Sequence, residues 1–387
     1  MSLKRKILLV ALSIVLLLVV VAFILNPFLK AGNKFGKTNL SSEKDSVTFW
    51  VTGDAMMHMP QYKAALNHET GLTEFDSCFT LIRPILNKAD VRMVNFETTL
   101  AGKPYSGFPR FSAPKEFPDA LCRAGFNLFL FANNHCNDKG KAGILGNINY
   151  ADSVKIWHTG IFKDSADRKS RYPLMLNINN WKIAVLNYTY GTNGFTEPKP
   201  LVINRIDSTQ ILKDILTAKL YNADAILAAM HWGEEYQHKQ NFKQKQIASF
   251  LLENGVDVII GSHPHIVQPI ELVTPIGSMN EKLVIWSLGN FISNQNDQYT
   301  DAGLLVGFTL KKDLHNKTIV SNVKYVPLYR MRFLSKKPGY FMMPGILTEK
   351  NIDSWLPNSE IKEDFISVMK DTRKKVNTSE RIVEVEN

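Results

Sequence analysis

Six short polar clusters stand directly after apolar runs, and they hold five of the nine histidines in this chain of 387 residues. Histidine, aspartate, glutamate and asparagine side chains supply nitrogen and oxygen ligands to divalent metals. Their recurrence therefore indicates a metal centre assembled from distant parts of the chain. The clusters are Gly53-Asp54-Ala55-Met56-Met57-His58, Asn95-Phe96-Glu97, Ala132-Asn133-Asn134-His135, His231-Trp232-Gly233, Gly261-Ser262-His263-Pro264-His265 and Ser287-Leu288-Gly289-Asn290-Phe291.

The elements that must position these clusters alternate between two periodicities. Short β-rich apolar runs are separated by amphipathic patterns, with helices expected at 208–220 and 242–254, and Gly255 stops the second of these. This alternation predicts βαβ units, an α/β fold in which the strands are buried on both faces. The expected strands lie at 47–51, 91–94, 128–131, 183–186, 225–230, 256–260 and 283–286.

Each polar cluster follows one of these expected strands. In sheets of parallel strands, ligands gather beyond the carboxyl ends, where the loops converge. The spacing therefore predicts that the clusters meet at one rim. The alternative is that each residue caps its own strand, and a single buried histidine is more often a hydrogen-bonded core residue than a ligand. Five histidines at one rim favour the shared site.

The amino terminus predicts a membrane anchor. Lys4-Arg5-Lys6 precede an apolar stretch at 7–25, which is long enough as a helix to cross a hydrocarbon core of about 30 Å. The positive flank should stay in the cytoplasm, which places the main domain in the periplasm or at the cell exterior. A cleaved signal peptide is the alternative, but the stretch exceeds the usual roughly 7 to 15 residues and lacks a convincing A-x-A site.

The expected organisation has four parts. A cytoplasmic flank and transmembrane signal anchor occupy 1–26, a solvated linker 27–46, the main domain 47–330 and a carboxyl-terminal extension 331–387. The end of the extension, 357–387, predicts a helix packed on the domain and then a frayed tail.

The net charge of +10 is not concentrated where nucleic acid would need it. Residues 1–46 contain seven lysines or arginines and two acidic residues, a net +5, and the rest of the chain has no basic run. This excludes a nucleic-acid arm and leaves an anionic polymer or a lipid surface as partner. The three cysteines, Cys78, Cys122 and Cys136, imply no disulfide framework and are expected to pack as small apolar residues, although Cys136 could be a thiol near the site.

Taken in order, the six clusters resemble the poly-γ-glutamate capsule biosynthesis proteins of the CapA type. The resemblance runs from about residue 47 to 308, and it includes 101–107, 187–194 and Glu235-Tyr236. That family is related to the calcineurin-like metallophosphoesterases. It thus implies an α/β fold of the metallophosphoesterase-like β-sandwich type, flanked by helices and here preceded by one transmembrane helix. Poly-γ-glutamate is the implied substrate or cargo, and other capsule-synthesis subunits are the implied partners.

The resemblance also implies roles for individual residues. Two divalent metals, whether Mn, Fe, Zn or Mg, would activate water for an in-line displacement. Glu97 would bridge them, His58 could join them, and His135 would donate a proton or steady the transition state. The phosphoesterase pattern has a histidine where this chain has Met56 and an aspartate where it has Glu97. The full set of implied metal ligands is Asp54, His58, Glu97, Asn134, His231, His263 and His265.

Further residues are assigned beside the metals. Asp138 is expected to orient His135, or else to cap a loop or helix. Substrate-binding positions are expected in the family-like segments, although partial burial of the aromatic rings would explain the tyrosines equally well. These positions are Tyr188, Tyr190, Glu235, Tyr236 and Asn290.

Three functions fit this sequence. The first is a membrane-anchored, extracytoplasmic protein of capsule or cell-envelope polymer biosynthesis, with a metal-dependent hydrolase or transferase site. The second is a non-catalytic subunit that binds or exports the polymer and uses the metal structurally. The third is a general periplasmic phosphoesterase. A complete ligand set with an open rim would favour the enzymes, and a sealed rim the scaffold.

Overall fold

A computed structural model of the chain describes residues 46–277, 280–333, 339–356 and 358–385. The predicted flank and anchor, and all of the predicted linker except residue 46, lie outside these residues. Within the described ranges, no helix is both long and apolar enough to cross a membrane. All elements below belong to the unit Asp45–Asn387.

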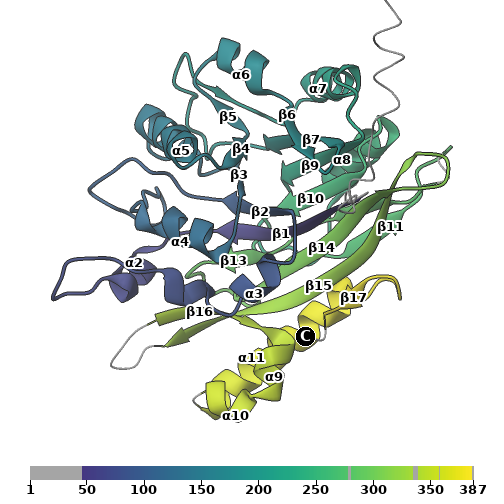
Figure 1. Cartoon of the computed structure of the whole chain (residues 1–387). Helices are drawn as coiled ribbons and strands as arrows, with labels where there is room; N and C mark the ends of the chain where they lie inside the picture. Colours follow the sequence, from purple (N-terminus) through teal and green to yellow (C-terminus); the bar gives the residue numbers. More distant parts are fainter. Residues whose placement is uncertain (1–45, 278–279, 334–338, 357, 386–387) are drawn as a thin grey trace, which may run out of the picture. The chain divides into compact units, whose positions relative to one another are not determined.

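The larger of two main sheets contains nine strands among the described residues (Figure 1). Its order is β16-β15-β14-β1-β2-β3-β4, with β13 beside β1 and β17 beside β15. Strands β1 to β4 run parallel, and β14 pairs antiparallel with β1 so that Ser46 lies opposite Lys311. The strands are β1 Ser46–Ala55, β2 Val91–Phe96, β3 Leu128–Leu130, β4 Trp157–Thr159, β13 Asn290–Ile292, β14 Ala302–Lys312, β15 Thr318–Phe333, β16 Gly339–Pro344 and β17 Val383–Glu384.

The second sheet contains six described strands in the order β11-β12-β10-β9-β7-β6. Strands β7, β9, β10 and β12 are parallel, while β6 and β11 are antiparallel edges. Its strands are β6 Leu174–Ile178, β7 Trp181–Thr189, β9 Ala225–His231, β10 Val258–Ser262, β11 Ile270–Val273 and β12 Lys282–Ile285. A separate pair joins β5 Ile161–Phe162 to β8 Val202–Ile203.

Helices cover the outer faces of both sheets. Those in the first half of the chain, apart from α6, flank the larger sheet, and α7 and α8 cover the second. Side-chain caps begin two of them, because Asp207 accepts from the Gln210 amide and Asn241 forms a capping box with Gln244. The helices are α2 Met59–Ala65, η2 Asp76–Phe79, α3 Arg83–Leu86, α4 Glu116–Ala124, α5 Gly140–Val154, α6 Ser165–Arg171, α7 Ser208–Leu220, α8 Phe242–Glu253, α9 Gly345–Lys350, α10 Ile352–Trp355 and α11 Ser359–Val376.

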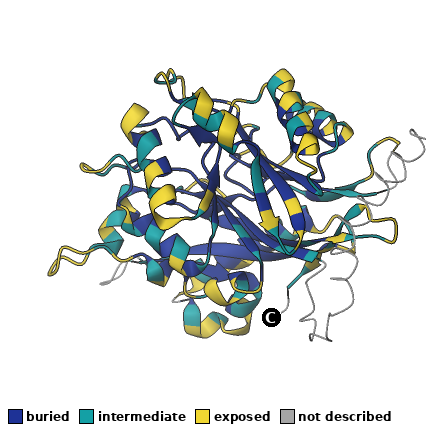
Figure 2. Cartoon of the chain, turned by 45° about the horizontal axis from the view of Figure 1, so that its top comes forward, coloured by how far each residue is buried: buried dark blue, intermediate teal, exposed yellow. Residues whose placement is uncertain are grey.

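The alternation of side chains along β1 separates the apolar layers. Phe49 and Val51 face the core between the two sheets, which also contains Val185 of β7 and Leu227 of β9, whereas Trp50 faces the core under the helices. The strands are consequently buried on both faces, while the helices expose their outer sides (Figure 2). The result is a mixed α/β fold in which two packed sheets are flanked by helices, as expected.

All seven expected strands and both expected helices are present, although their ends differ by a few residues. The carboxyl-terminal extension is more integrated than expected. The predicted boundary after residue 330 falls inside β15, and α11 buries Phe365 and Met369 in the core between the sheets. The end of the chain is not frayed throughout, because Val383 and Glu384 pair with β15.

Candidate metal centre

Asp54 is fixed at the carboxyl end of β1 by an unusually close strand contact. A side chain at Gly53 would place its Cβ 1.9 Å from the Gly289 carbonyl oxygen, so only glycine allows β13 to pair here. Asp54 itself is fully buried. In the Gly-Asp sequence, Gly53 thus allows the close contact between strands, and Asp54 supplies the buried carboxylate.

A carboxylate network extends from Asp54 across the end of β2. The amide Nδ2 of Asn95 donates to Asp54 Oδ1 at 2.7 Å and to Glu97 Oε2 at 3.1 Å. Both carboxylates are completely shielded from solvent. Asn95 therefore holds two buried acidic groups side by side without supplying a positive charge.

His231, the last residue of β9, brings the second sheet to this network. Its Nδ1 lies 2.9 Å from Ser262 Oγ, and its Nε2 lies 2.7 Å from Asn134 Oδ1 and 3.7 Å from Glu97 Oε1. The serine contact fixes the ring and turns Nε2 toward the acidic groups. The site thus spans both sheets.

His263 and His265 enter from the loop after β10 with left-handed backbone angles, φ 100° and 61°. Such angles are costly for residues other than glycine and are concentrated at functional sites. His265 Nδ1 lies 3.1 Å from Asp54 Oδ2 and 3.2 Å from Asn290 Oδ1. The ring centroids of His231 and His263 are 4.8 Å apart.

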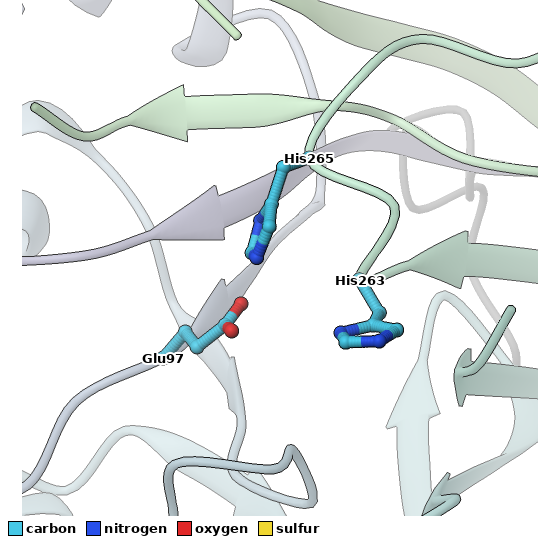
Figure 3. Close-up of side chains that lie close together, drawn as sticks. All are labelled: Glu97, His263 and His265. Atoms are coloured by element: carbon cyan, nitrogen blue, oxygen red, sulfur yellow. The ribbon is translucent and has the colours of Figure 1, made fainter. Parts of the chain in front are cut away.

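The cluster contains two sets of three side chains whose ligand atoms all lie within 4.8 Å of one another. One is Glu97, His263 and His265, drawn in Figure 3 with the side chains directed toward one another, and the other is Asp54, Glu97 and His231. Among the described residues, Glu97 Oε1 and His263 Nδ1 have no hydrogen-bond partner although both are buried. Unpaired buried ligand atoms of the right chemistry fit a divalent metal. Glu97 belongs to both sets.

Burial sets the charge states in the cluster. It raises the pKa of Glu97 well above its usual range, with the neighbouring Asp54 adding to the effect, and it lowers the pKa of His231 and His263 well below 6.5. Neutral imidazoles keep a lone pair for a metal but do not compensate buried acidic groups. A cation bound beside Glu97 would favour the charged form of its carboxyl group.

His135 and Asp138 form a pair beside the cluster. His135 Nδ1 lies 2.8 Å from Asp138 Oδ2, and the Phe111 amide also donates to that oxygen at 2.7 Å. The Asp138 carboxylate is thus placed to orient the ring, as expected. His135 is in neither set of three, and its role as a proton donor stays a prediction.

The hydrogen-bonding neighbours of His58 are Gln61 and Asn294, which are not among the predicted ligands. Its Nδ1 is 3.3 Å from Gln61 Oε1 and accepts from the Asn294 amide at 3.2 Å, and it belongs to neither set of three. Burial lowers the pKa of His58 to about 4. With Nδ1 engaged in this way, only its other nitrogen could face a metal, and its ligand role stays a prediction.

The five predicted substrate positions divide into two groups. Tyr190 and Tyr236 are 40% and 38% exposed, and their rings lie 4.5 Å from His263 and 6.1 Å from His265, respectively. Glu235 Oε1 lies 3.8 Å from His265 Nε2 and its side chain is 43% exposed. These three residues are partly exposed and lie beside the buried histidines.

Tyr188 and Asn290 do not belong to this exposed group. Tyr188 is fully buried under the helices, where its hydroxyl donates to Asp214, so the prediction that it lines a groove is wrong. The end of β7 at Thr189 explains the error, because Tyr188 lies within the strand and packs under the helices, whereas Tyr190 lies beyond the strand end, beside His263. Asn290 is also buried and contacts His265 Nδ1, a position that orients a ligand and does not meet a substrate.

Three residues of the site were not identified from the sequence. Asn95 and Ser262 were quoted within motifs but received no role, although they hold Glu97 and His231. Asn193 accepts from Asn134 Nδ2 at 3.1 Å, which turns the Asn134 oxygen toward His231, and its Nδ2 lies 3.4 Å from His135 Nδ1. The Asn193-Gly194 pair, both left-handed in φ, was the available signal of a special turn.

Comparisons with known proteins support the motif assignment. Residues 48–295 match the family described as "Bacterial capsule synthesis protein PGA_cap". The chain belongs to this family. It is 27% identical over 301 residues to the "Capsule biosynthesis protein CapA" of Bacillus anthracis, covering 74% of this chain and 68% of that protein. It is 28% identical over 276 residues to the "PGA biosynthesis protein CapA" of Bacillus subtilis (strain 168), covering 70% and 69%.

Solved structures show a weaker, general likeness. The Haemophilus influenzae NAD nucleotidase NadN matches with a TM-score of 0.48 and 10% identity over 88% of this chain and 64% of that one. A putative 5′-nucleotidase from Staphylococcus aureus matches with a TM-score of 0.47 and 12% identity over 84% and 58%. This family member therefore spans about three fifths of each solved protein.

Proposed function

We propose that this chain is a membrane-anchored, extracytoplasmic protein of capsule polymer biosynthesis that uses two divalent metals to hydrolyse or transfer a bond in an anionic polymer such as poly-γ-glutamate. The membership of the capsule synthesis family and the printed function of its CapA relatives support the polymer. The position of Glu97 in both sets of three supports two metals. That shared carboxylate is the observation that carries the proposal.

The ligands would divide between the metals as follows. Asp54, His231 and Asn134 would hold one metal, His263 and His265 the other, and Glu97 would bridge them. When bound, the pair supplies a Lewis acid and a water activated at neutral pH. This division follows the two sets of three that share Glu97, with Asn134 beside His231, whereas the sequence resemblance implies one histidine of the 263/265 pair for each metal.

The chain's own residues would then perform the remaining steps. His135, oriented by Asp138, would deliver a proton to the departing group at the ring nitrogen that Asp138 leaves free. Tyr190 and Tyr236 would flank the bound segment, and Asn193 would keep Asn134 turned inward. Both tyrosines are exposed beside histidines that are themselves buried, so a polymer segment could reach the edge of the site at Tyr190 and Tyr236.

Two histidine variants test this proposal. His135→Ala should retain metal, measured by elemental analysis of the purified chain, but lower turnover by about 10²- to 10⁴-fold. His263→Ala should lose metal and activity together. Substrates are a panel of phosphoesters and glutamyl polymers. His158→Ala, at a buried histidine paired with Asp152 outside the cluster, is the control and should change neither metal content nor turnover.

Measurements in cells separate the alternatives. If His135→Ala supports normal polymer production while His263→Ala abolishes it, the metal is structural and the polymer-binding or export subunit replaces the enzyme. If phosphoesters are cleaved and glutamyl polymers are not, the protein is a periplasmic phosphoesterase. The location has its own test, since a reporter fused after Asn387 should be active outside the cytoplasm and resist carbonate extraction.

A further inference from the structure

The end of the two sheets opposite the metal centre is built from three hairpin turns and the start of β1. The β6–β7 turn reaches Ser46, because Asn179 Nδ2 donates to the Ser46 carbonyl at 3.1 Å. The β11–β12 and β14–β15 turns meet, because Asn280 Nδ2 lies 3.5 Å from the Thr318 carbonyl oxygen. Together they border a cleft of about 690 Å³ that is lined by residues of both turns.

Two of these turns expose large aliphatic side chains. Ile276 is 99% exposed and Leu314 is 103% exposed, the highest values among the exposed large hydrophobic residues of the described chain. Each side chain projects from the tip of a hairpin and not from the side of a sheet. Isolated exposed aliphatic residues need no explanation, but Ile276 and Leu314 belong to two turns that contact one another, and together they are called the apolar point.

The surroundings of this apolar point are positively charged. Two acidic residues at this end are already neutralised, since Asp224 pairs with Lys312 at 2.7 Å and Asp257 pairs with Lys282. A third, Asp313, accepts from the backbone amides of its own turn. The remaining exposed side chains include four lysines, so the surface has a net positive charge; these are Lys182, Lys219, Lys311 and Lys317.

We propose that this end of the molecule, with Ile276 and Leu314 at its centre and lysines around them, docks on an anionic lipid surface. Aliphatic tips can enter the boundary between headgroups and acyl chains, while lysines contact anionic headgroups. Chain continuity favours the same occupant. Ser46, the first described residue, lies opposite Lys311, and the sequence before it contains a basic flank and the apolar stretch 7–25.

Docking of this kind would also orient the metal centre. Ser46 and Asp54 lie at opposite ends of β1, and the strand rises about 3.3 Å per residue, so the metal centre would face away from the lipid by roughly 25 Å. A linker of about 20 residues could extend to roughly 70 Å and would not fix this orientation alone. The inference concerns a separate surface and does not depend on the proposed chemistry.

The test uses the full chain reconstituted in vesicles, with an environment-sensitive dye attached at one cysteine. In a Cys122→Ser background, the dye is placed by Ile276→Cys or Leu314→Cys, and by Phe242→Cys as the control. Phe242 is 74% exposed and begins α8, which follows β9 at the metal-centre end. Vesicles contain phosphatidylcholine alone or phosphatidylcholine with phosphatidylglycerol.

The expected result is a blue shift and increased emission at 276 and 314, but not at 242, in vesicles that contain phosphatidylglycerol. High salt should reduce the shift because it screens the lysines. Lys311→Glu with Lys317→Glu should weaken docking by at least about 25-fold, taking about fivefold for each lysine lost. The matched substitution Lys245→Glu, on α8, should have no effect.

Equal dye signals at 242, 276 and 314 would overturn the proposal. So would a shift that appears only when other membrane proteins are present, because the occupant would then be a protein. Metal content, measured on the same samples, should be unchanged by the lysine substitutions. If the chain shows the dye shift but no metal-dependent activity, the result counts against the proposed function and leaves the docking proposal standing.

Discussion

Buried acidic groups occur at both ends of the sheets, but their surroundings differ. At the hairpin end, the buried Asp257 is paired with Lys282 and the half-buried Asp224 with Lys312. At the rim, the ion-pair partners of Asp54 and Glu97 among the described residues are histidines only, at 3.1 Å and 3.7 Å. Since burial lowers the pKa of His231 well below 6.5, its ring is neutral at pH 7.

This difference indicates which end of the sheets needs a bound ligand to pair with its acidic groups. Buried charges are stable when they are paired. Lysines pair with the acidic groups at the hairpin end, and lysines at the rim could have done the same. The rim instead surrounds its acidic groups with amides and imidazoles, which are ligands. The ion pairs at the hairpin end lie within the chain, whereas the proposed metal would complete the rim.

The largest expected effect comes from Glu97→Gln. The substitution keeps the shape of the side chain but removes the charge common to both sets of three, so the affinity for Mn²⁺ or Zn²⁺ should fall by more than about 100-fold. Titration calorimetry measures this, and the variant should be no less stable than the wild type without metal. An unchanged affinity would show that Glu97 is not a ligand.

Asp257→Asn should produce the opposite pattern at the hairpin end. It leaves the Lys282 ammonium without its partner in a mostly buried position, so the free energy of unfolding should fall by about 2 kcal/mol. The affinity for metal should not change. Denaturant unfolding and calorimetry on the same preparation test both statements, and a loss of metal binding would remove the distinction between the two ends.

A smaller effect is expected at Asn193, which contacts ligands without being one. Asn193→Gly preserves the left-handed turn but releases the Asn134 amide, so metal affinity should fall about tenfold. Asn193→Asp retains the oxygen that accepts from Asn134 and should restore most of it. Asn222→Gly, at an exposed left-handed asparagine, is the matched control. Equal effects at 193 and 222 would indicate a turn without influence on the ligands.

The smallest effect concerns Asp301. Its carboxyl group is neither paired as at the hairpin end nor placed among candidate metal ligands as at the rim. Burial raises its pKa to about 7, with Asp364 adding to the rise and Arg330 opposing it. The folded carboxyl therefore keeps a proton that the unfolded chain has lost, and its stabilising contribution declines as the pH rises from about 4 to about 7. Because Asp364 shares the proton, we expect about 1 kcal/mol between these pH values. Asp301→Asn should remove this decline, as measured by denaturant unfolding.

The sequence predicted the rim better than it predicted the sheets. Parallel strands such as β1, β9 and β10 are buried on both faces, and their continuous apolar runs end in polar residues, which revealed both the element and the site. The long antiparallel strands β14 and β15 were not identified. Both strands are buried over much of their length, and the long pairing between them depends on contacts that no local periodicity specifies.

Within the site, residue type identified the ligands but not the residues that hold them. Asp54 and His263 are recognised by chemistry that a metal requires. The roles of Asn95, Ser262 and Asn193 depend on partners that are distant in sequence, such as Ser262 and His231 across neighbouring strands. The prediction for Tyr188 failed for the same reason. The direction of its side chain depends on how β7 pairs with β9 and not on the motif that contains it.

The candidate ligands come from both sheets: Asp54, Glu97 and Asn134 from loops and strands of the larger one, and His231, His263 and His265 from the second. Metal bound among them would link the two layers much as a covalent cross-link does. Separating the sheets would then require breaking coordination first, so the protein would unfold slowly and resist proteases for as long as metal is retained. Metal supply would in this way set the lifetime of the folded protein.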